Sequence, residues 1–329
     1  MTALAARTGR PVNFVRNSSP DYQQVQSQIF GLIRAELPGA DVSETVEERR
    51  DDAINFGIHI RLGRGERQVP MPLDVLMSHG LADKDYLLLT GLDGRRLINA
   101  YEHVLVAGSW FRSKLLLTRF HPVARRRVRL ARSQIHLAGW PRLDLLLRQQ
   151  QQQQQPRQGR VRVLWAPSHN MAGREHNYSS YPAFEDYLPR LEQAFEVRVS
   201  LHPSNRTDKS PTAGDLQWAD AVVTDFGTML YEAWALGKCV VMPDWLFPDE
   251  MLRGRGTQKR SAEGRVYSRG IGDHAGNIDE LCGMLAAAKP PGRDVTAFMD
   301  RILAPEYRGV SARRVAELLL TLPLKRRAG

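Results

Sequence analysis

The stretch Ala219-Asp220-Ala221-Val222-Val223-Thr224-Asp225-Phe226-Gly227-Thr228 joins a short β-branched run to a polar turn and the start of a helical pattern. Apolar residues recur on one side from Gly227 to Leu236, and Gly237 can end the helix. Asp225 stands where it can cap the first turn. A strand that enters a helix through a tight polar turn is typical of a Rossmann-like domain.

The same alternation of β-rich runs and helical stretches surrounds this unit and predicts a parallel sheet covered by helices, an α/β fold. In the second half we expect strands at Val161–Ala166, Val197–Leu201, Ala221–Thr224 and Cys239–Met242, and helices at Pro182–Ala194, Gly227–Leu236 and Ile278–Ala287. In the first half we expect strands at Val12–Arg16, Asp74–Met77, His103–Ala107 and Ile135–Ala138, a helix within Asn17–Glu48, and a terminal helix at Ser311–Leu320.

A run of glutamines from Gln149 to Gln155, followed by Pro156, divides the chain near its middle. Such a polar run has no apolar residue to anchor it in a core, which is typical of a linker. The chain of 329 residues is long enough for two domains. We therefore predict an N-terminal domain at 1–148, a linker at 149–160, a C-terminal domain at 161–310, and a terminal helix with a basic tail at 311–329.

Composition excludes several classes of protein. Hydrophobic residues make up 42% and charged residues 25%, which are values of an ordinary globular chain. The two cysteines are too few for a disulfide framework, and no apolar stretch has the length of an export signal or a membrane span. We expect a cytoplasmic protein.

Positive charge is concentrated in one segment. The formal net charge is +10, and no Asp or Glu occurs between Ala107 and Arg142. The basic residues of this segment are Arg112, Lys114, Arg119, Arg125, Arg126, Arg127, Arg129, Arg132 and Arg142. They form a solvated charge run, a contact for an anionic membrane surface or polyphosphate acceptor, or a contact for nucleic acid. Arg125, Arg126, Arg127 and Arg142 are the candidate contacts.

The segment Ser78-His79-Gly80 follows the expected strand Asp74–Met77 directly. Ligands of open α/β sheets bind at the carboxyl ends of strands, and a histidine there suits general-base work on a hydroxyl. Gly80 lets an acceptor approach the backbone closely. The alternative for His79 is a packing or turn histidine.

Two further segments suit a phosphate group. His202 and Arg206 lie beyond the strand that ends at Leu201, and Pro203 fixes the exit of the chain. The helix that starts at Gly227-Thr228 offers backbone N–H groups, the positive end of its dipole and a hydroxyl.

Three further polar residues are candidates. Glu232, one helical turn beyond Thr228, either reaches a ribose hydroxyl or faces solvent. His169 and His176 either line the site or are ordinary surface residues. Because there is no Asp-x-Asp pair and no His/Cys cluster with ligand spacing, a metal ion is not expected.

Several stretches together resemble the CDP-glycerol glycerophosphotransferase family over about residues 74–255. The second half supplies Val163-Leu164-Trp165-Ala166-Pro167-Ser168-His169, Leu201-His202-Pro203, the Ala219–Thr228 stretch and Glu232-Ala233-Trp234-Ala235-Leu236-Gly237-Lys238. The first half supplies Ser78-His79-Gly80 and Ala138-Gly139-Trp140-Pro141-Arg142-Leu143-Asp144. The sequence departs from the family at Gly227-Thr228, where two serines are usual, and at Glu232-Ala233.

The resemblance implies a GT-B fold, with two Rossmann-like domains facing one another across a cleft. It implies transfer of glycerol phosphate, or a related polyol phosphate, from a CDP-activated donor to a hydroxyl of a growing polymer of the teichoic-acid or capsule type, without a cofactor. His79 is then the general base and His202 contacts the donor diphosphate. The remaining donor-binding residues are Asp225, Gly227, Thr228, Glu232, Arg206 and His169.

The partners expected from this resemblance are the nucleotide-activated donor, a polyol-phosphate or glycan acceptor that can be lipid-linked, and an anionic membrane surface. Two alternatives stay open. The first is a GT-B glycosyltransferase or epimerase that uses a UDP-sugar, because a glutamate near a helix-bound diphosphate also suits that donor. The second is a basic nucleic-acid-binding protein, although no recognition motif for nucleic acid is present.

Overall fold

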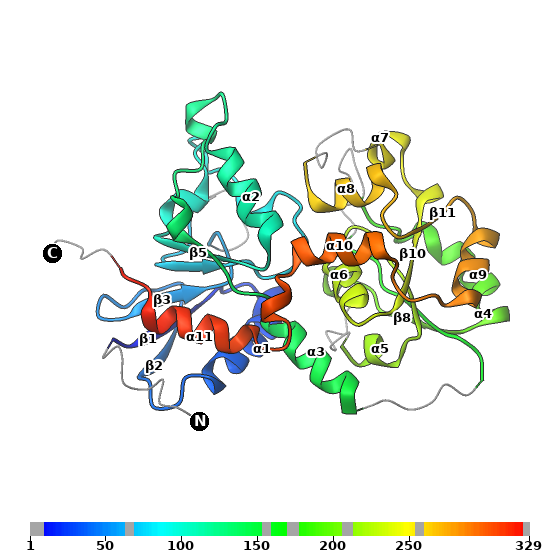
Figure 1. Ribbon diagram of the computed structural model, residues 1–329, viewed down its shortest axis with the longest axis horizontal. Helices are drawn as coiled ribbons and strands as arrows, with labels where there is room; N and C mark the ends of the chain where they lie inside the picture. The colour runs from blue at the N-terminus through cyan, green and yellow to red at the C-terminus, as the bar shows by residue number, and fades with distance from the viewer. Residues whose placement is uncertain are drawn as a thin grey trace. The chain divides into compact units, whose positions relative to one another are not determined.

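The structure, a computed structural model, describes residues 10–62, 69–152, 159–169, 178–205, 213–253 and 260–324. The chain forms two compact units (Figure 1). Unit 1 comprises Met1–Gly80, Asp85–Asp144 and Arg301–Gly329, and unit 2 comprises Leu81–Lys84 and Leu145–Asp300. Each unit contains one sheet of parallel strands, so the predicted α/β class is confirmed.

The sheet of unit 1 has the order β2-β1-β3-β4-β5-β6, and every neighbouring pair is parallel. Its strands are β1 (Val12–Arg16), β2 (Val42–Val46), β3 (Ile54–Gly57), β4 (Val75–Met77), β5 (His103–Val106) and β6 (Ile135–Leu137). Its helices are α1 (Gln23–Ala35), α2 (Ser109–Thr118), the first part of α3 (Pro141–Gln152) and α11 (Ser311–Thr321). Helix α11 runs beside α1 (Figure 1).

Three aromatic side chains join α1 to the sheet of unit 1. The ring of Phe14 in β1 lies 5.0 Å from that of Phe30 and 5.7 Å from that of Phe56, measured between centroids. Helix α1 buries Ile29, Phe30 and Ile33, which recur at helical spacing on one face. Burial of this face fixes the helix on the sheet.

The sheet of unit 2 has the order β11-β10-β9-β7-β8, again with parallel pairs throughout. Its strands are β7 (Arg162–Trp165), β8 (Glu196–Val199), β9 (Ala221–Val223), β10 (Cys239–Pro243) and β11 (Asp273–Ala275). Its helices are α4 (Leu188–Ala194), α5 (Ala213–Trp218), α6 (Thr228–Ala235), α7 (Asp249–Leu252), α8 (Ala262–Arg269), α9 (Ile278–Ala287) and most of α10 (Arg293–Ile302). Val163, Val223 and Val241 of three neighbouring strands share one buried core with Leu281 and Leu285 of α9.

The structure differs from the expected elements in a few places. The helix expected at Pro182–Ala194 is a 3₁₀ turn over Ala183–Tyr187 followed by α4. The sequence analysis did not find the strands β2, β3 and β11 or the helices α2, α5, α7, α8 and α10. Strand β2 reads Val-Ser-Glu-Thr-Val and is partly exposed along its length, so it lacks the buried apolar run by which strands were found.

The last part of the chain returns to unit 1. Ala304 N donates to Ala107 O over 2.9 Å, and the buried Asp144 carboxylate accepts from Ala312 N over 2.8 Å. Gly139 has φ +71°, and a Cβ there would lie 2.4 Å from Ser311 Oγ. Helix α11 is therefore seated by Gly139, just before α3, and by Asp144 in the first turn of α3.

Helix α3 continues to Gln152 and so extends into the linker expected at 149–160. Residues 153–158 of that linker lie outside the described residues. By contacts the boundary between the units falls between Asp144 and Leu145, inside α3.

We predict that Gly139→Ala and Asp144→Ala each destabilise the protein. The first substitution adds left-handed backbone strain and a clash with Ser311, and the second leaves the Ala312 amide without its acceptor, so each costs about 2 kcal/mol or more. Urea unfolding measures the loss. Gly39→Ala, at φ +79° with no neighbour near its Cβ position, isolates the backbone strain and should cost less than Gly139→Ala. Equal losses for the two glycines would contradict the role of the Ser311 contact.

Candidate active site

The carboxyl end of the sheet in unit 2 has a topological switch point between β7 and β9. The first strand of the unit, β7, lies between the second, β8, and the third, β9. The chain therefore leaves β7 and β9 in opposite directions and opens a crevice at their carboxyl ends, where open α/β sheets bind ligands. Ser168 and His169 follow β7, and Gly227 and Thr228 follow β9.

A buried carboxylate holds the loops at this switch point together. Asp225 is 0% exposed, and it accepts from Ser168 N over 2.8 Å, Ser180 N over 2.7 Å and Ser180 Oγ over 2.9 Å. Burial raises the pKa of the Asp225 carboxyl, and the hydrogen bonds from Ser180 and Ser168 oppose that rise. Asp225, in the loop after β9, therefore joins that loop to both ends of the connection that follows β7.

The expected cap of α6 by Asp225 is wrong, because its oxygens are used by these serines. The N-cap of α6 is Gly227, and no side chain caps it. A Cβ at Gly227 would lie 3.3 Å from Ser168 Cβ, so glycine lets the two loops pack closely. The first amides of α6 are thus presented at the crevice, where the helix dipole favours an anion.

Two histidines meet beyond the carboxyl ends of β7 and β8. The rings of His169 and His202 lie 5.2 Å apart in an edge-to-face arrangement. His202 Nδ1 accepts from Ser204 N over 3.2 Å, which fixes the ring on the turn after β8. Both side chains are half-buried. The structure thus brings His169 and His202 together, whereas Arg206 and His176 lie outside the described residues.

A short segment of unit 2 comes from early in the chain. Leu81–Lys84 belongs to unit 2, and Ala82 N donates to Thr228 Oγ1 over 3.3 Å. The Thr228 hydroxyl therefore serves as acceptor here and keeps its O–H for another partner. The fully buried Glu263 accepts from Asp83 N over 2.8 Å and from Lys84 N over 3.1 Å.

The sequence analysis missed Glu263 because it stands in a stretch without a strand-end signal. Tyr231 of α6 donates its hydroxyl to Glu263 over 2.8 Å. Through Glu263, this contact connects the segment Leu81–Lys84 to α6. Glu232, the next residue of α6, is 1% exposed, so the alternative of a solvent-facing glutamate is wrong.

In unit 1, His79 lies in an aromatic cluster at the carboxyl edge of the sheet. Its ring centroid is 5.0 Å from that of His59, stacked at 22°, and 4.5 Å from that of Tyr86, edge to face. Tyr22 contacts both histidines, because its ring lies 4.2 Å from that of His59 and 5.7 Å from that of His79. Tyr22 follows β1, His59 follows β3 and His79 follows β4, so the cluster occupies the switch point of this sheet.

His59 is the residue of this cluster that the sequence analysis missed. It is 2% exposed, and burial followed by the charge of His79 lowers its pKa well below the usual value. A neutral imidazole therefore lies against His79. The signal that could have found it is the strand Ile54–Gly57 directly before it, which was not recognised as a strand.

The arginines expected to contact an anion are at the surface of unit 1. Arg125, Arg126 and Arg127 are exposed in and after the 3₁₀ turn Ala124–Arg126. Arg142 is half-buried in the first turn of α3, directly beyond the carboxyl end of β6. Arg142 therefore lies in a different element from the exposed arginines Arg125, Arg126 and Arg127.

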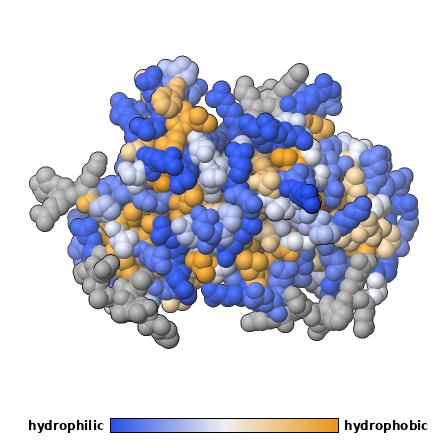
Figure 2. Space-filling view, viewed as in Figure 1, coloured by the Kyte–Doolittle hydropathy of each residue, from blue (hydrophilic) through white to orange (hydrophobic). Residues whose placement is uncertain are grey.

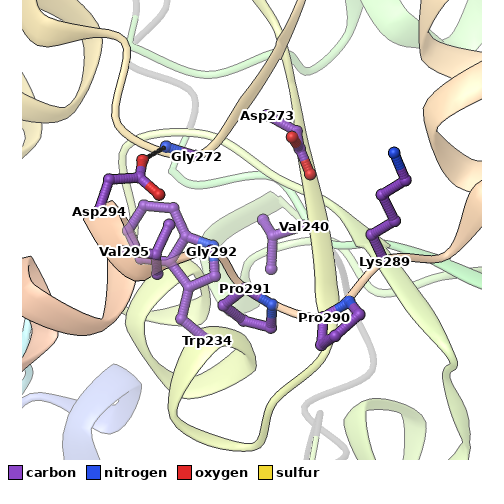
Figure 3. Close-up of a pocket in the computed structure, with 10 residues that line it drawn as sticks. All are labelled: Trp234, Val240, Gly272, Asp273, Lys289, Pro290, Pro291, Gly292, Asp294 and Val295. Atoms are coloured by element: carbon purple, nitrogen blue, oxygen red, sulfur yellow. Dashed lines mark hydrogen bonds between the residues drawn. The ribbon is translucent and has the colours of Figure 1, made fainter.

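A pocket of unit 2 lies at the amino ends of β10 and β11, away from the switch point (Figure 3). It has a volume of about 180 Å³ and is lined by residues at the start of β10 and β11, by Trp234 and by the loop from Lys289 to Gly292. Pockets that bind small molecules usually have volumes of roughly 300 Å³ or more, so this pocket is too small for a nucleotide. Within the described part of the chain, no group of three His, Cys, Asp or Glu side chains could hold a metal ion.

Known proteins share this fold. A structure of the wall teichoic acid polymerase TagF superimposes with a TM-score of 0.60 at 11% identity, covering 95% of this chain and 89% of TagF. A histidine-to-alanine variant of TagF gives a TM-score of 0.56 at 11% identity, with the same coverage. A histidine-to-asparagine variant soaked with CDPG gives 0.53 at 11% identity, covering 94% of this chain and 87% of TagF. The chain has a GT-B fold.

At this level of identity the likeness shows the fold alone. No protein-family model matches the sequence, and neither does any curated protein. The two Rossmann-like units expected from the sequence are thereby confirmed, and the reaction has to be argued from the residues.

We predict that Asp225→Ala lowers the free energy of unfolding by about 3 kcal/mol or more, because the buried amides of Ser168 and Ser180 lose their acceptor. Asp225→Asn should lose less, since its carbonyl oxygen still accepts. Asp249→Ala is the control, because its side chain is 79% exposed and should change stability by less than about 0.5 kcal/mol. Urea unfolding of the three variants checks this, and parent-like stability of Asp225→Ala would refute the role of this carboxylate.

We also predict that stability falls as the pH drops below about 6.5, the usual pKa of histidine in an unfolded chain. Burial lowers the pKa of His59, and it lowers that of His136 to about 4. Between the folded and unfolded pKa values the unfolded chain binds more protons, so stability rises with pH, by up to about 1.4 kcal/mol per pH unit for each histidine. His59→Phe and His136→Gln should each flatten this slope in urea unfolding between about pH 5 and pH 7. A parent-like slope in both variants would show that neither histidine is the cause.

Proposed function

We propose that this protein transfers glycerol phosphate, or a related polyol phosphate, from a CDP-activated donor to a hydroxyl of a growing cell-surface polymer. The observation that carries the proposal is the switch point of unit 2, where an uncapped helix end, a hydroxyl and two paired histidines all follow the carboxyl ends of neighbouring strands. The GT-B fold shared with TagF, a wall teichoic acid polymerase, supports the reaction class. The residues Ser78-His79-Gly80 and Leu201-His202-Pro203 support the donor type.

The donor diphosphate is assigned to the start of α6. The amides of Gly227 and Thr228 and the Thr228 hydroxyl donate to its oxygens, and His202 contacts the phosphate that leaves with the nucleotide. His169 lies against His202 and adds a second imidazole to the same side. Asp225 acts through the loops that it joins. Arg206 and Glu232 complete the proposed donor set.

The chemistry follows from these positions. His79 takes the proton of the acceptor hydroxyl, and the oxygen attacks the phosphorus that bears the polyol. The bond between that phosphorus and the bridging oxygen breaks, and the nucleoside monophosphate leaves with the bonding electrons. Transfer of this kind needs positioning and compensation of negative charge, which the helix amides, His202 and the Thr228 hydroxyl provide.

His79 requires its neutral form to accept that proton. The stacked His59 and the surrounding Tyr22 and Tyr86 hold its ring, and His59 is itself kept neutral by burial. Along the chain, His79 lies three residues before Ala82, whose amide binds Thr228. The base is thereby tied through a short stretch of backbone to the donor-side helix.

The test is a donor assay. The protein is incubated with CDP-glycerol and an acceptor that ends in glycerol phosphate, and release of CMP is followed. Binding of CDP-glycerol should raise the melting temperature, by mass action. A rise with UDP-sugars and none with CDP-glycerol would refute the proposed donor and favour a sugar-nucleotide enzyme.

Two histidine variants should separate binding from chemistry in this assay. We predict that His79→Ala lowers kcat by about 10²–10⁴-fold and leaves the Kd of the donor near its parent value, because a general base acts only in the chemical step. His202→Ala should raise the donor Kd by about tenfold and lower kcat as well, since its contact exists before chemistry. His121→Gln, in a surface turn of unit 1, is the control. Full turnover of His79→Ala, or an unchanged donor Kd of His202→Ala, would contradict the role assigned to that residue.

A further inference from the structure

Charged side chains ordinarily lie at the surface of a protein, because burial removes their water. Figure 2 shows hydrophilic side chains spread over the visible face of the molecule, and none of the described helices is long and apolar enough to cross a membrane. Lys84 departs from the ordinary pattern, since its side chain is half-buried in unit 2.

The other lysines that the structure describes either reach water or have a partner. Lys289 is exposed, Lys114 forms an ion pair, and Lys238 donates to a backbone carbonyl over 2.6 Å. Among the described residues, the ammonium of Lys84 has neither an ion pair nor a hydrogen bond. Lys84 therefore carries a charge that has lost part of its water without gaining a direct partner.

The electrostatic surroundings place this charge near the switch point of unit 2. Burial lowers the pKa of the Lys84 ammonium, and the charges of Glu263 and Asp225 oppose that fall. Both carboxylates already accept hydrogen bonds from other groups, Asp225 from two serines and Glu263 from a tyrosine and two amides. An ammonium in this position is stabilised by an anion that reaches it from outside.

The backbone that carries Lys84 is fixed to two helices of unit 2. Ala82 N donates to Thr228 Oγ1 at the start of α6, and Glu263 in the first turn of α8 accepts from Lys84 N over 3.1 Å. In the opposite direction, Asp83 Oδ2 accepts from the first amide of α8 over 2.9 Å. Both of these carboxylates are buried. The segment before Lys84 is therefore held directly beside the helix end assigned to the diphosphate.

The turn at Lys84 has an unusual backbone conformation. Lys84 has φ +38° and the next residue, Asp85, has φ +54°, which side chains with a Cβ rarely adopt. Such angles persist where the surrounding contacts determine them, and they gather at ligand sites. Here the hydrogen bond to Glu263 holds Lys84, and the ion pair with Lys114 holds Asp85. The direction in which the Lys84 side chain leaves the backbone is therefore fixed.

The donor site as assigned so far contains little positive charge. A diphosphate carries a negative charge on each phosphorus, whereas the start of a helix supplies about half of a positive charge. Asp225 and Glu232 are acids, the two histidines are imidazoles, and Arg206 lies outside the described residues. A lysine binds phosphate as a compact point charge with three donors. Lys84 has the charge that this edge of the sheet requires.

We propose that Lys84 binds the donor diphosphate, its ammonium donating to phosphate oxygens beside the start of α6. This role rests on the proposed function, because the diphosphate is that of the proposed donor. The contact exists before chemistry, so it contributes to the affinity for the donor. It also gives the inserted segment Leu81–Lys84 a use at the site that its hydrogen bonds to α6 and α8 alone do not supply.

The test measures the Kd of CDP-glycerol and of CDP for the full chain by isothermal titration calorimetry. Lys84→Met removes the charge and keeps the length of the side chain, so it should raise both Kd values by about tenfold or more, the effect of one charged hydrogen bond. Lys84→Arg keeps the charge and should bind CDP-glycerol at least about threefold more tightly than Lys84→Met.

Lys289→Met is the matched control. It removes the same charge from an exposed lysine of unit 2 at the amino ends of the strands, and it should leave the Kd within about twofold of the parent value, since salt screens an exposed charge. The melting temperature without ligand reports the fold of each variant. If Lys84 served the fold alone, Lys84→Met would lower the melting temperature and leave the Kd unchanged.

The outcomes separate this role from the proposed function. A Lys84→Met variant that binds CDP-glycerol as tightly as the parent overturns the role of Lys84 and leaves the proposed function standing. A loss of affinity in Lys289→Met as large as that in Lys84→Met shows an effect of net charge and also overturns the role. A parent protein that binds neither CDP-glycerol nor CDP refutes the proposed function and the role of Lys84 together.

Discussion

In both sheets the first strand of the unit pairs in parallel with the second on one side and the third on the other. Parallel pairing requires each connection to cross back over the sheet, so every strand ends at the same edge. The two connections that flank the first strand leave the sheet in opposite directions. Their loops therefore meet beside the carboxyl end of that strand. In unit 2 this brings Ser168 to Gly227, and in unit 1 it brings Tyr22 to His59. The parallel strand order alone therefore brings the candidate residues to the same edge of each sheet, whatever their individual contacts.

The loops at these edges then need internal hydrogen bonds, because buried backbone donors must find acceptors. In unit 2 a single carboxylate, Asp225 in the loop after β9, satisfies two amides of the connection that follows β7. In unit 1 the corresponding buried carboxylate, Asp74, is at the amino end of β4 and accepts from Asn55 N and Asn55 Nδ2. Asp225 therefore orders the carboxyl edge of the sheet in unit 2, whereas Asp74 orders the amino edge of the sheet in unit 1. Only the first is in a position to affect a bound ligand.

Much of the fold could be predicted from the sequence, since buried parallel strands such as Val12–Arg16 and Ala221–Val223 are compact apolar runs. Strands β2 and β11 escaped because they are partly exposed and carry polar residues. The candidate site was found only where a strand had been found first, which explains why His202 was identified and His59 was not. Glu263 also follows no strand, and its partners Asp83 and Lys84 lie far from it in the sequence.

The motifs that carry the family resemblance divide into two physical classes once burial is known. Gly139 and Asp144 are buried against the start of α11, and Asp225 is buried beneath its loops, so substitution at these positions acts on the fold first. His79, His202 and Thr228 keep part of their surface at the carboxyl edges of the sheets. A motif match alone weights both classes equally, although only the second can contact a substrate. Of the two departures from the family, the buried Gly227 keeps the close approach to Ser168, and the half-buried Thr228 keeps a hydroxyl. Under the proposed function, these two residues preserve the helix amides and the hydroxyl that a phosphate would use and alter the shape around them, which is where discrimination among donors would arise.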